Sequence, residues 1–68
     1  MELTNDERTL LLLYFEENRV RTIANLTAMR SELQTDEREL FQLTNAVICK
    51  LENISDDAFQ SLDLFEMG

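Results

Sequence analysis

The sequence predicts an all-α fold, a three-helix antiparallel bundle with a short C-terminal fourth helix. Apolar side chains in residues 36–53 and just beyond recur every three or four positions, the period of one helix face: Leu40, Leu43, Val47, Leu51 and Ile54. Phe41, Thr44 and Ile48 widen this face, so this central helix needs cover from more than one direction. Capping signals precede several expected helices: Thr4 with Glu7, then Thr35 or Asp36, of which Asp36 has capping-box spacing to Glu39, and Ser55. The connections are short, which favours antiparallel neighbours.

The length of 68 residues sets the organisation of the chain. We expect a single helical domain spanning residues 1–68, with helices at about 5–17, 20–33, 36–53 and 56–62. A core of this size usually provides only about 3–5 kcal/mol of net stability. One cysteine excludes an intramolecular disulfide, and the absence of histidine excludes a zinc site of the usual Cys/His kind. Stability must therefore come from helix packing or from a partner, including a second copy.

The first helix carries an apolar run over residues 10–15. Thr4 and Glu7 have the spacing of a capping box in front of it, and the leucines and the absence of β-branched residues from the run favour helix over strand. A helix that is apolar all round cannot bury every side chain against one neighbour. Either two elements enclose it, or some of these three side chains remain exposed as a partner-binding patch: Leu12, Tyr14 and Phe15.

The second helix follows a turn in which Asn18 is the candidate for an unusual backbone angle or for the next N-cap. Its expected inner face consists of Val20, Ile23, Ala24, Leu26 and Leu33. Arg30 falls near the middle of that face. We expect its stem to lie over apolar surface while its guanidinium reaches water or an acidic neighbour. The alternative is a recognition contact.

The C-terminal segment carries the signature of a short helix. Ser55 is a typical N-cap, and Asp56 and Asp57 in the next two positions suit the positive end of a helix dipole. Ile54 and Phe59 have the spacing of a hydrophobic staple, which predicts that this helix folds back onto the bundle. In the tail that follows, Leu64 and Phe65 alternate with acidic residues. These two can dock or fray.

The residues offer little material for catalysis. Histidine, the most frequent acid or base near neutral pH, is absent. Cys49 lies on the polar side of its helix with no cation positioned to stabilise a thiolate, since Lys50 is turned about a hundred degrees away. The paired carboxylates lie at expected helix ends, where capping, dipole effects and solvation explain them. We therefore predict no catalytic, metal-binding or cofactor-binding residues.

The charge balance is strongly acidic, with 14 acidic against 6 basic residues and a net charge of -8. This charge opposes direct binding to a phosphate backbone and favours a protein partner with a basic surface, such as a DNA-processing protein. An acidic surface also keeps a small bundle soluble without any partner. The acidic start lacks the basic leader of a signal peptide, and no apolar run is long enough for a membrane, so we expect a cytoplasmic protein.

Several segments together resemble a known family. They are Leu3-Thr4 with Glu7 leading into Leu10 to Tyr14, Arg21-Thr22-Ile23 with Leu26, Asp36-Glu37 with Leu40, and Lys50-Leu51 followed by Ser55-Asp56-Asp57-Ala58-Phe59 and Leu62-Asp63-Leu64. In this order the chain resembles the transposon-transfer assisting protein family, small acidic proteins of conjugative transposons in Gram-positive bacteria. The last run is the most specific part. The resemblance implies a cytoplasmic accessory role in element transfer through a protein partner, and it supplies no catalytic residues.

Our leading hypothesis is a non-enzymatic accessory protein of a conjugative transposon that binds the transfer machinery, as a monomer or weak homo-oligomer. An acidic face would meet a basic surface, with apolar anchors. The candidate partner-binding residues are Leu12, Tyr14, Phe15, Asp56, Asp57, Leu64 and Phe65. Three alternatives stay open: an acidic DNA mimic that inhibits a host DNA-binding enzyme, sequence-specific DNA binding by the second or third helix, and a self-associating structural bundle.

Overall fold

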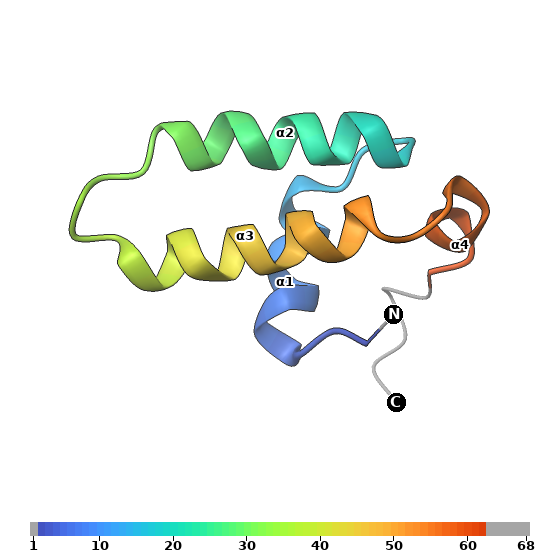
Figure 1. Cartoon of the computed structure of the whole chain (residues 1–68), viewed down its shortest axis with the longest axis horizontal. Helices are drawn as coiled ribbons and strands as arrows, with labels where there is room; N and C mark the ends of the chain where they lie inside the picture. The colour runs from blue at the N-terminus through green and yellow to red at the C-terminus, as the bar shows by residue number, and fades with distance from the viewer. Residues whose placement is uncertain (1, 63–68) are drawn as a thin grey trace.

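The computed structural model describes residues 2–62, and the regular structure in this part of the chain is entirely helical. The helices are α1 (Asn5–Tyr14), α2 (Arg19–Ser31), α3 (Arg38–Glu52) and α4 (Asp56–Gln60). The predicted all-α class is confirmed, with three main helices and a short fourth. α2 and α3 lie side by side and antiparallel, and α4 lies at the end where α2 begins and α3 finishes (Figure 1).

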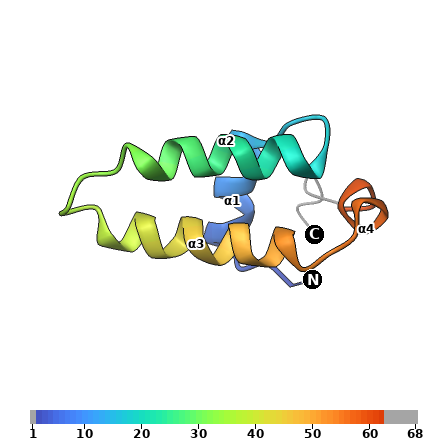
Figure 2. The ribbon, with the colours of Figure 1, turned by 45° about the horizontal axis from the view of Figure 1, so that its top comes forward.

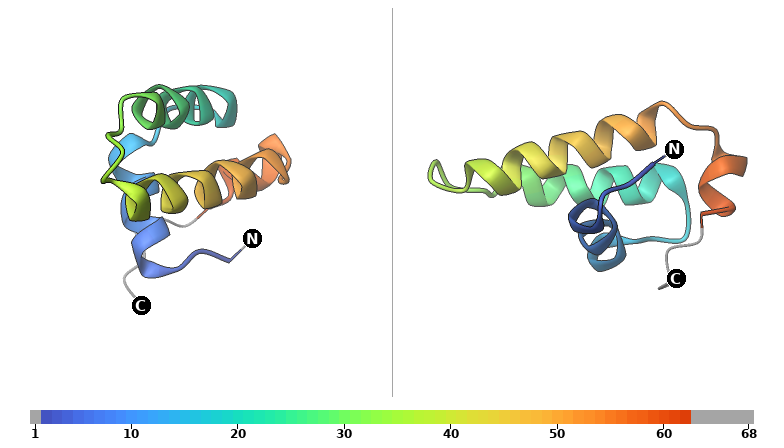
Figure 3. Two further views of the ribbon diagram at one scale, coloured as in Figure 1. Left: turned by 60° about the vertical axis from the view of Figure 1, so that its left-hand side comes forward. Right: turned by 90° about the horizontal axis from the view of Figure 1, so that it is seen from below.

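The first helix runs across the α2–α3 pair and lies against one side of it (Figures 2 and 3). Its direction is set by the α1–α2 connection, where Phe15 (φ -64°, ψ 130°) and Asn18 (φ -144°, ψ 168°) are extended. The buried Thr22 hydroxyl fixes this connection, since it accepts from the Glu16 N–H at 3.0 Å and donates to the Asn18 carbonyl at 2.9 Å. The connection therefore directs α1 across the pair formed by α2 and α3.

The helices are slightly shorter than the sequence suggests. α1 ends at Tyr14, because Phe15 leaves the helical region and stacks its ring on Phe59. α3 begins at Arg38 after Glu37, which makes no side-chain capping bond to the helix. The expected Asp36 cap is therefore wrong: the Glu37 carboxylate instead accepts from the Gln34 N–H at 3.2 Å within the turn.

Two other predicted caps are confirmed. Asn18 is the N-cap of α2, and its side chain accepts from the Arg21 N–H at 2.8 Å. Ser55 caps α4 by accepting from the Ala58 N–H at 3.0 Å. Ile54, before this cap, is half-buried against the core that contains Phe59, consistent with the expected staple. These caps satisfy backbone N–H groups that a helix cannot satisfy internally.

All four helices contribute to one core. Its buried apolar side chains are Leu10, Leu11, Leu26, Val47, Ile48, Leu51 and Phe59. The expected inner face of α2 is wrong at its start, because Val20 is 63% exposed and Ala24 is also exposed. Phe41 is likewise 43% exposed, although the sequence placed it on the apolar face of α3. Thr22, a polar residue that was not among the expected inner-face residues of α2, is fully buried.

A buried glutamate joins α1 to α3. Glu7 completes the predicted capping box, since its carboxylate accepts from the Thr4 N–H at 2.8 Å and its own N–H donates to the Thr4 hydroxyl at 3.1 Å. The same carboxylate oxygen lies 2.5 Å from the Lys50 ammonium, which also donates to the Glu2 carbonyl at 2.9 Å. We call this set the Glu7 clamp.

Opposing effects act on the ionisation of Glu7. Burial raises the pKa of its carboxyl, whereas hydrogen bonds from Lys50 and Thr4 and the charge of Lys50 lower the pKa. The lowering effects win, so the pKa lies below its ordinary value. The clamp therefore stabilises the ionised carboxylate, and hence the folded state at neutral pH.

Two substitutions separate the parts of the clamp. Glu7→Gln keeps an oxygen and a shape suited to the capping box but removes the charge facing Lys50, so we expect a loss of about 1–2 kcal/mol. Glu7→Ala also removes the acceptor for the Thr4 N–H, and we expect about 2–4 kcal/mol. Urea unfolding followed by circular dichroism measures both. Equal losses of stability in the two variants would mean that the hydrogen bond from the Thr4 N–H to Glu7 contributes nothing.

The clamp also predicts a pH dependence. Because the pKa of Glu7 is lower in the folded protein than in the unfolded chain, its stabilisation is complete above the unfolded pKa and is lost as pH falls through the folded pKa. Other carboxylates titrate in the same range, so the informative quantity is the difference between the wild type and Glu7→Gln. We expect that difference to be constant near neutral pH and to shrink towards zero in acid. A difference that grew in acid would contradict the clamp.

Candidate functional site

One end of the molecule gathers acidic residues from two distant segments. The α1–α2 connection meets α4 there, because the Phe15 and Phe59 rings stack with centroids 5.0 Å apart and planes 9° apart. The Gln60 side chain also donates to the Glu17 carbonyl at 3.2 Å. We call this surface the acidic end and define it by four residues: Glu16, Glu17, Asp56 and Asp57.

Arg19 organises the acidic end from within. Its Nε lies 2.8 Å from a carboxylate oxygen of Asp56, and a second guanidinium nitrogen donates to the Leu51 carbonyl at 3.1 Å. The side chain of Arg19 is 22% exposed, against 72% for Asp56. Arg19 therefore connects the beginning of α2 to the last turn of α3 and the first turn of α4. Asp56, a predicted partner-binding residue, thus also holds the fold together.

The other carboxylates of the acidic end differ in their exposure and contacts. Glu17 forms an exposed ion pair with Arg21 at 3.3 Å on the same turn of chain, a kind of pair that contributes little to stability. Asp57, also predicted, is exposed in the first turn of α4. Glu16 is half-buried, and its carboxylate accepts from the Asn25 amide at 3.5 Å. Glu17, Asp56 and Asp57 thus present the accessible negative charge of this end, and of these Asp56 also contacts Arg19.

The predicted apolar anchors are less exposed than an open patch would be. Leu12, Tyr14 and Phe15 are all half-buried and pack against the core. Leu13 is instead the exposed side chain of this apolar run, with 73% of its surface accessible. The sequence could not identify it, because a run that is apolar all round does not reveal which side faces water. The other predicted anchors, Leu64 and Phe65, lie outside the described residues.

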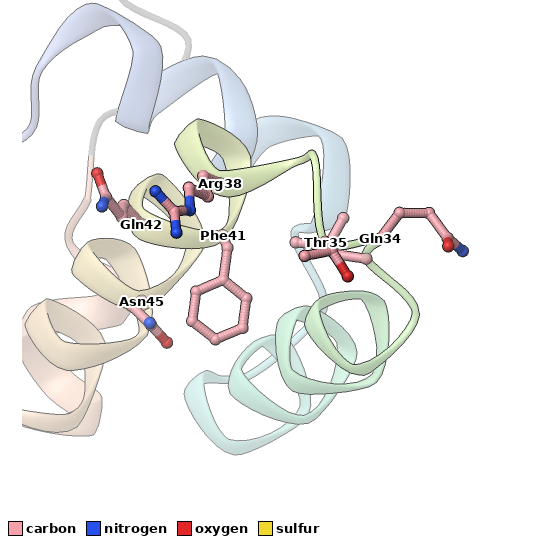
Figure 4. Close-up of a pocket in the computed structure, with 7 residues that line it drawn as sticks. Gln34, Thr35, Arg38, Phe41, Gln42 and Asn45 are labelled. Atoms are coloured by element: carbon pink, nitrogen blue, oxygen red, sulfur yellow. The ribbon is translucent and has the colours of Figure 1, made fainter.

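The opposite end of the α2–α3 pair contains a hollow of about 530 Å³. Its walls come from the α2–α3 connection and the first half of α3: Leu33, Gln34, Thr35, Arg38, Phe41, Gln42 and Asn45. Figure 4 shows the Phe41 ring projecting from α3 towards the facing helix, with Arg38 and Asn45 beside it. We call this the Phe41 hollow. The α2–α3 connection and the first turns of α3, which supply the lining residues, lie beyond the place where α1 crosses the pair (Figure 1).

Sequence reasoning missed this hollow, although part of its signal was visible. Arg38, Gln42 and Asn45 recur at helical spacing on the polar side of α3, and Phe41 lies at the border between that side and the apolar face. Arg30 was expected to reach water or an acidic group. Its guanidinium instead donates to the Asn45 side chain at 2.5 Å and lies 6.0 Å from the centre of the Phe41 ring.

Among residues 2–62, no group of three His, Cys, Asp or Glu side chains is placed to hold a metal ion. Cys49 is exposed, as the sequence suggested. None of the helices that the structure describes has the length and apolar character needed to cross a membrane.

A family model described as "Putative transposon-transfer assisting protein" matches residues 3–66. No curated protein and no solved structure matches the chain. The family description names an assisting role in transfer and not an enzymatic activity. The matched range includes both the acidic end and the Phe41 hollow.

Arg19 gives a prediction for the architecture of the acidic end. Arg19→Met keeps most of the stem but removes the ion pair with Asp56 and the side-chain donor to the Leu51 carbonyl, which still accepts from the Ile54 N–H at 3.5 Å, so we expect a loss of about 1–2 kcal/mol. Asp56→Asn removes only the exposed half of an ion pair and should cost less than about 1 kcal/mol. Urea unfolding of the two variants tests this order. A larger loss for Asp56→Asn would show that the ion pair, and not the carbonyl contact, holds this end.

Proposed function

Because this chain belongs to the family of transposon-transfer assisting proteins, we propose that it is a non-enzymatic accessory protein of a conjugative transposon. It acts in the cytoplasm by binding a protein of the transfer machinery. The observation that carries the proposal is the family match over residues 3–66. The charge and the exposed surfaces of the described residues support the protein-binding mechanism.

Electrostatics favour a basic partner surface. The chain has a net charge of -8, and the acidic end adds exposed carboxylates at Glu17 and Asp57. A negative surface speeds encounter with a positive one and suppresses binding to other acidic surfaces. Proteins that process DNA commonly carry basic surfaces for the phosphate backbone. We therefore propose that the acidic end contacts such a surface on a transfer protein.

Apolar side chains beside the acidic end supply the anchor in this proposal. Tyr14 and Phe15 are half-buried, so each keeps part of its side chain accessible where α1 ends. Aromatic side chains in a desolvated centre usually dominate binding energy, while charges at the rim mainly steer association. Leu12 on the same helix and Leu64 and Phe65 in the tail complete the proposed anchor set.

The alternatives from the sequence remain predictions. A DNA mimic would need carboxylates spaced like phosphates along one extended face, and self-association would need a matching surface on a second copy. No contact of the described residues favours either one over binding to a transfer protein. We therefore propose no second function.

Charge reversal tests the proposal in cells. Donor cells carry the element with the double variant Glu17→Lys and Asp57→Lys, which changes four units of charge at the acidic end and leaves Arg19 and Asp56 in place. We expect transfer frequency to fall about tenfold or more, because the encounter and the rim contacts both depend on this charge. Conjugative mating into a marked recipient measures the frequency.

A matched control separates local charge from total charge. Glu32→Lys and Glu39→Lys make the same change at exposed positions near the other end of the hairpin, and we expect nearly normal transfer. Circular dichroism of both purified double variants verifies folding. Normal transfer by the Glu17→Lys and Asp57→Lys variant would overturn the role of the acidic end. An equal loss for both variants would show that total charge matters and not this surface.

A further inference from the structure

One side of α1 and of its C-cap residue carries Arg8, Leu12 and Phe15. These residues follow one another at intervals of four and three positions, so their side chains lie along one face. All three are half-buried. Leu12 and Phe15 pack against the core, and the Nε atom of Arg8 is buried. Another side of the same helix faces water, since Leu13 is 73% exposed. We call the half-buried side the Arg8 face.

The described part of the chain ends close to the Arg8 face. The Phe59 ring of α4 stacks on Phe15 with the two ring centroids 5.0 Å apart. The Leu62 N–H donates to the Phe59 carbonyl at 3.1 Å, and the Leu62 side chain packs against the core. Residue 62 is therefore within one turn of chain from the ring that contacts the Phe15 end of the face. We call the next four residues, 63–66, the tail.

The tail is long enough to follow the Arg8 face to its far end. A helix rises about 1.5 Å per residue, so the distance along α1 from Phe15 to Arg8 is about 10 Å. Four extended residues span up to about 13–14 Å, which brings Glu66 within reach of Arg8 when the tail starts from Leu62. The family match extends to residue 66, so the tail is included with the helices in the matched range.

We propose that the tail docks on the Arg8 face of its own molecule and runs antiparallel to α1. Leu64 and Phe65 pack against Leu12, which removes apolar surface of all three side chains from water. The Glu66 carboxylate meets the Arg8 guanidinium, and this charge-assisted contact fixes the register. A second copy is a poorer source of the tail, because two chains of net charge -8 repel each other. A tail attached to the same chain is also always at short range.

The carboxylates nearest to Arg8 in sequence are directed elsewhere. Glu7 is held in the Glu7 clamp, and Asp6 lies on the other side of the helix, where it lines a separate hollow with Leu13. Glu16, beyond the other end of the face, accepts from a side-chain amide of α2. Arg8 is therefore the positive charge that α1 presents on the side nearest the tail. The inference concerns the chain alone and does not rest on the proposed function, so either one can fail without the other.

Nuclear Overhauser effects (NOEs) in the purified full chain test the docking. We expect NOEs between the ring protons of Phe65 and the methyl groups of Leu12. Phe65→Ala should shift those methyl resonances, because it removes a neighbouring ring. Phe41→Ala removes an exposed ring elsewhere and should leave them unchanged. The inference is overturned if the folded chain gives no NOE between the tail and α1. NOEs that arise only between differently labelled copies also overturn it, because they place the tail on a second molecule.

A charge change in the tail tests the register. Glu66→Lys replaces attraction to Arg8 by repulsion, so we expect the NOEs between Phe65 and Leu12 to lose about half or more of their intensity. Asp63→Lys makes the same charge change at the start of the tail and should leave that intensity nearly unchanged. Circular dichroism verifies that both variants fold. NOEs that survive Glu66→Lys at full intensity, or that Asp63→Lys weakens equally, would overturn the inference.

Discussion

The buried contact between Glu7 and Lys50 is the constraint on which the rest of the arrangement depends. One carboxylate caps α1 through Thr4 and also receives the ammonium of α3, so the start of the first helix is fixed against the central helix. The extended connection at residues 15–18 fixes the other end of α1. Together they hold α1 across the α2–α3 pair, and the core forms where the three helices meet. Because the Glu7 side chain is only 7% exposed, loss of Lys50 would leave a buried charge without its ion-pair partner.

This crossing explains the character of the two ends of the hairpin. Where α2 begins and α3 finishes, α4 packs against the connection through Phe15 and Phe59, and Arg19 satisfies the last turn of α3. At the other end, the hairpin extends beyond α1, so Phe41 keeps part of its ring in solvent. One end is thus closed by α4, while the other contains the Phe41 hollow.

Local signals in the sequence were sufficient for the helices but not for the way they pack. The caps at Thr4, Asn18 and Ser55 were visible because each depends on a few consecutive residues. The burial of Thr22, the exposure of Val20 and the exposure of Phe41 were not visible, because they depend on where α1 crosses the pair. The acidic residues at positions 56 and 57, which the sequence predicts to bind a partner, are exposed. Their connection to Arg19 needed the distance between segments remote in sequence.

A double-mutant cycle between Glu7→Gln and Lys50→Met tests the central claim most directly. If the two side chains act as one clamp, the stability losses of the single variants will not add in the double variant. The expected coupling energy is about 1–3 kcal/mol by urea unfolding at neutral pH. A coupling energy near zero would contradict the claim, because the position of α1 would then depend on the apolar core and the connection alone.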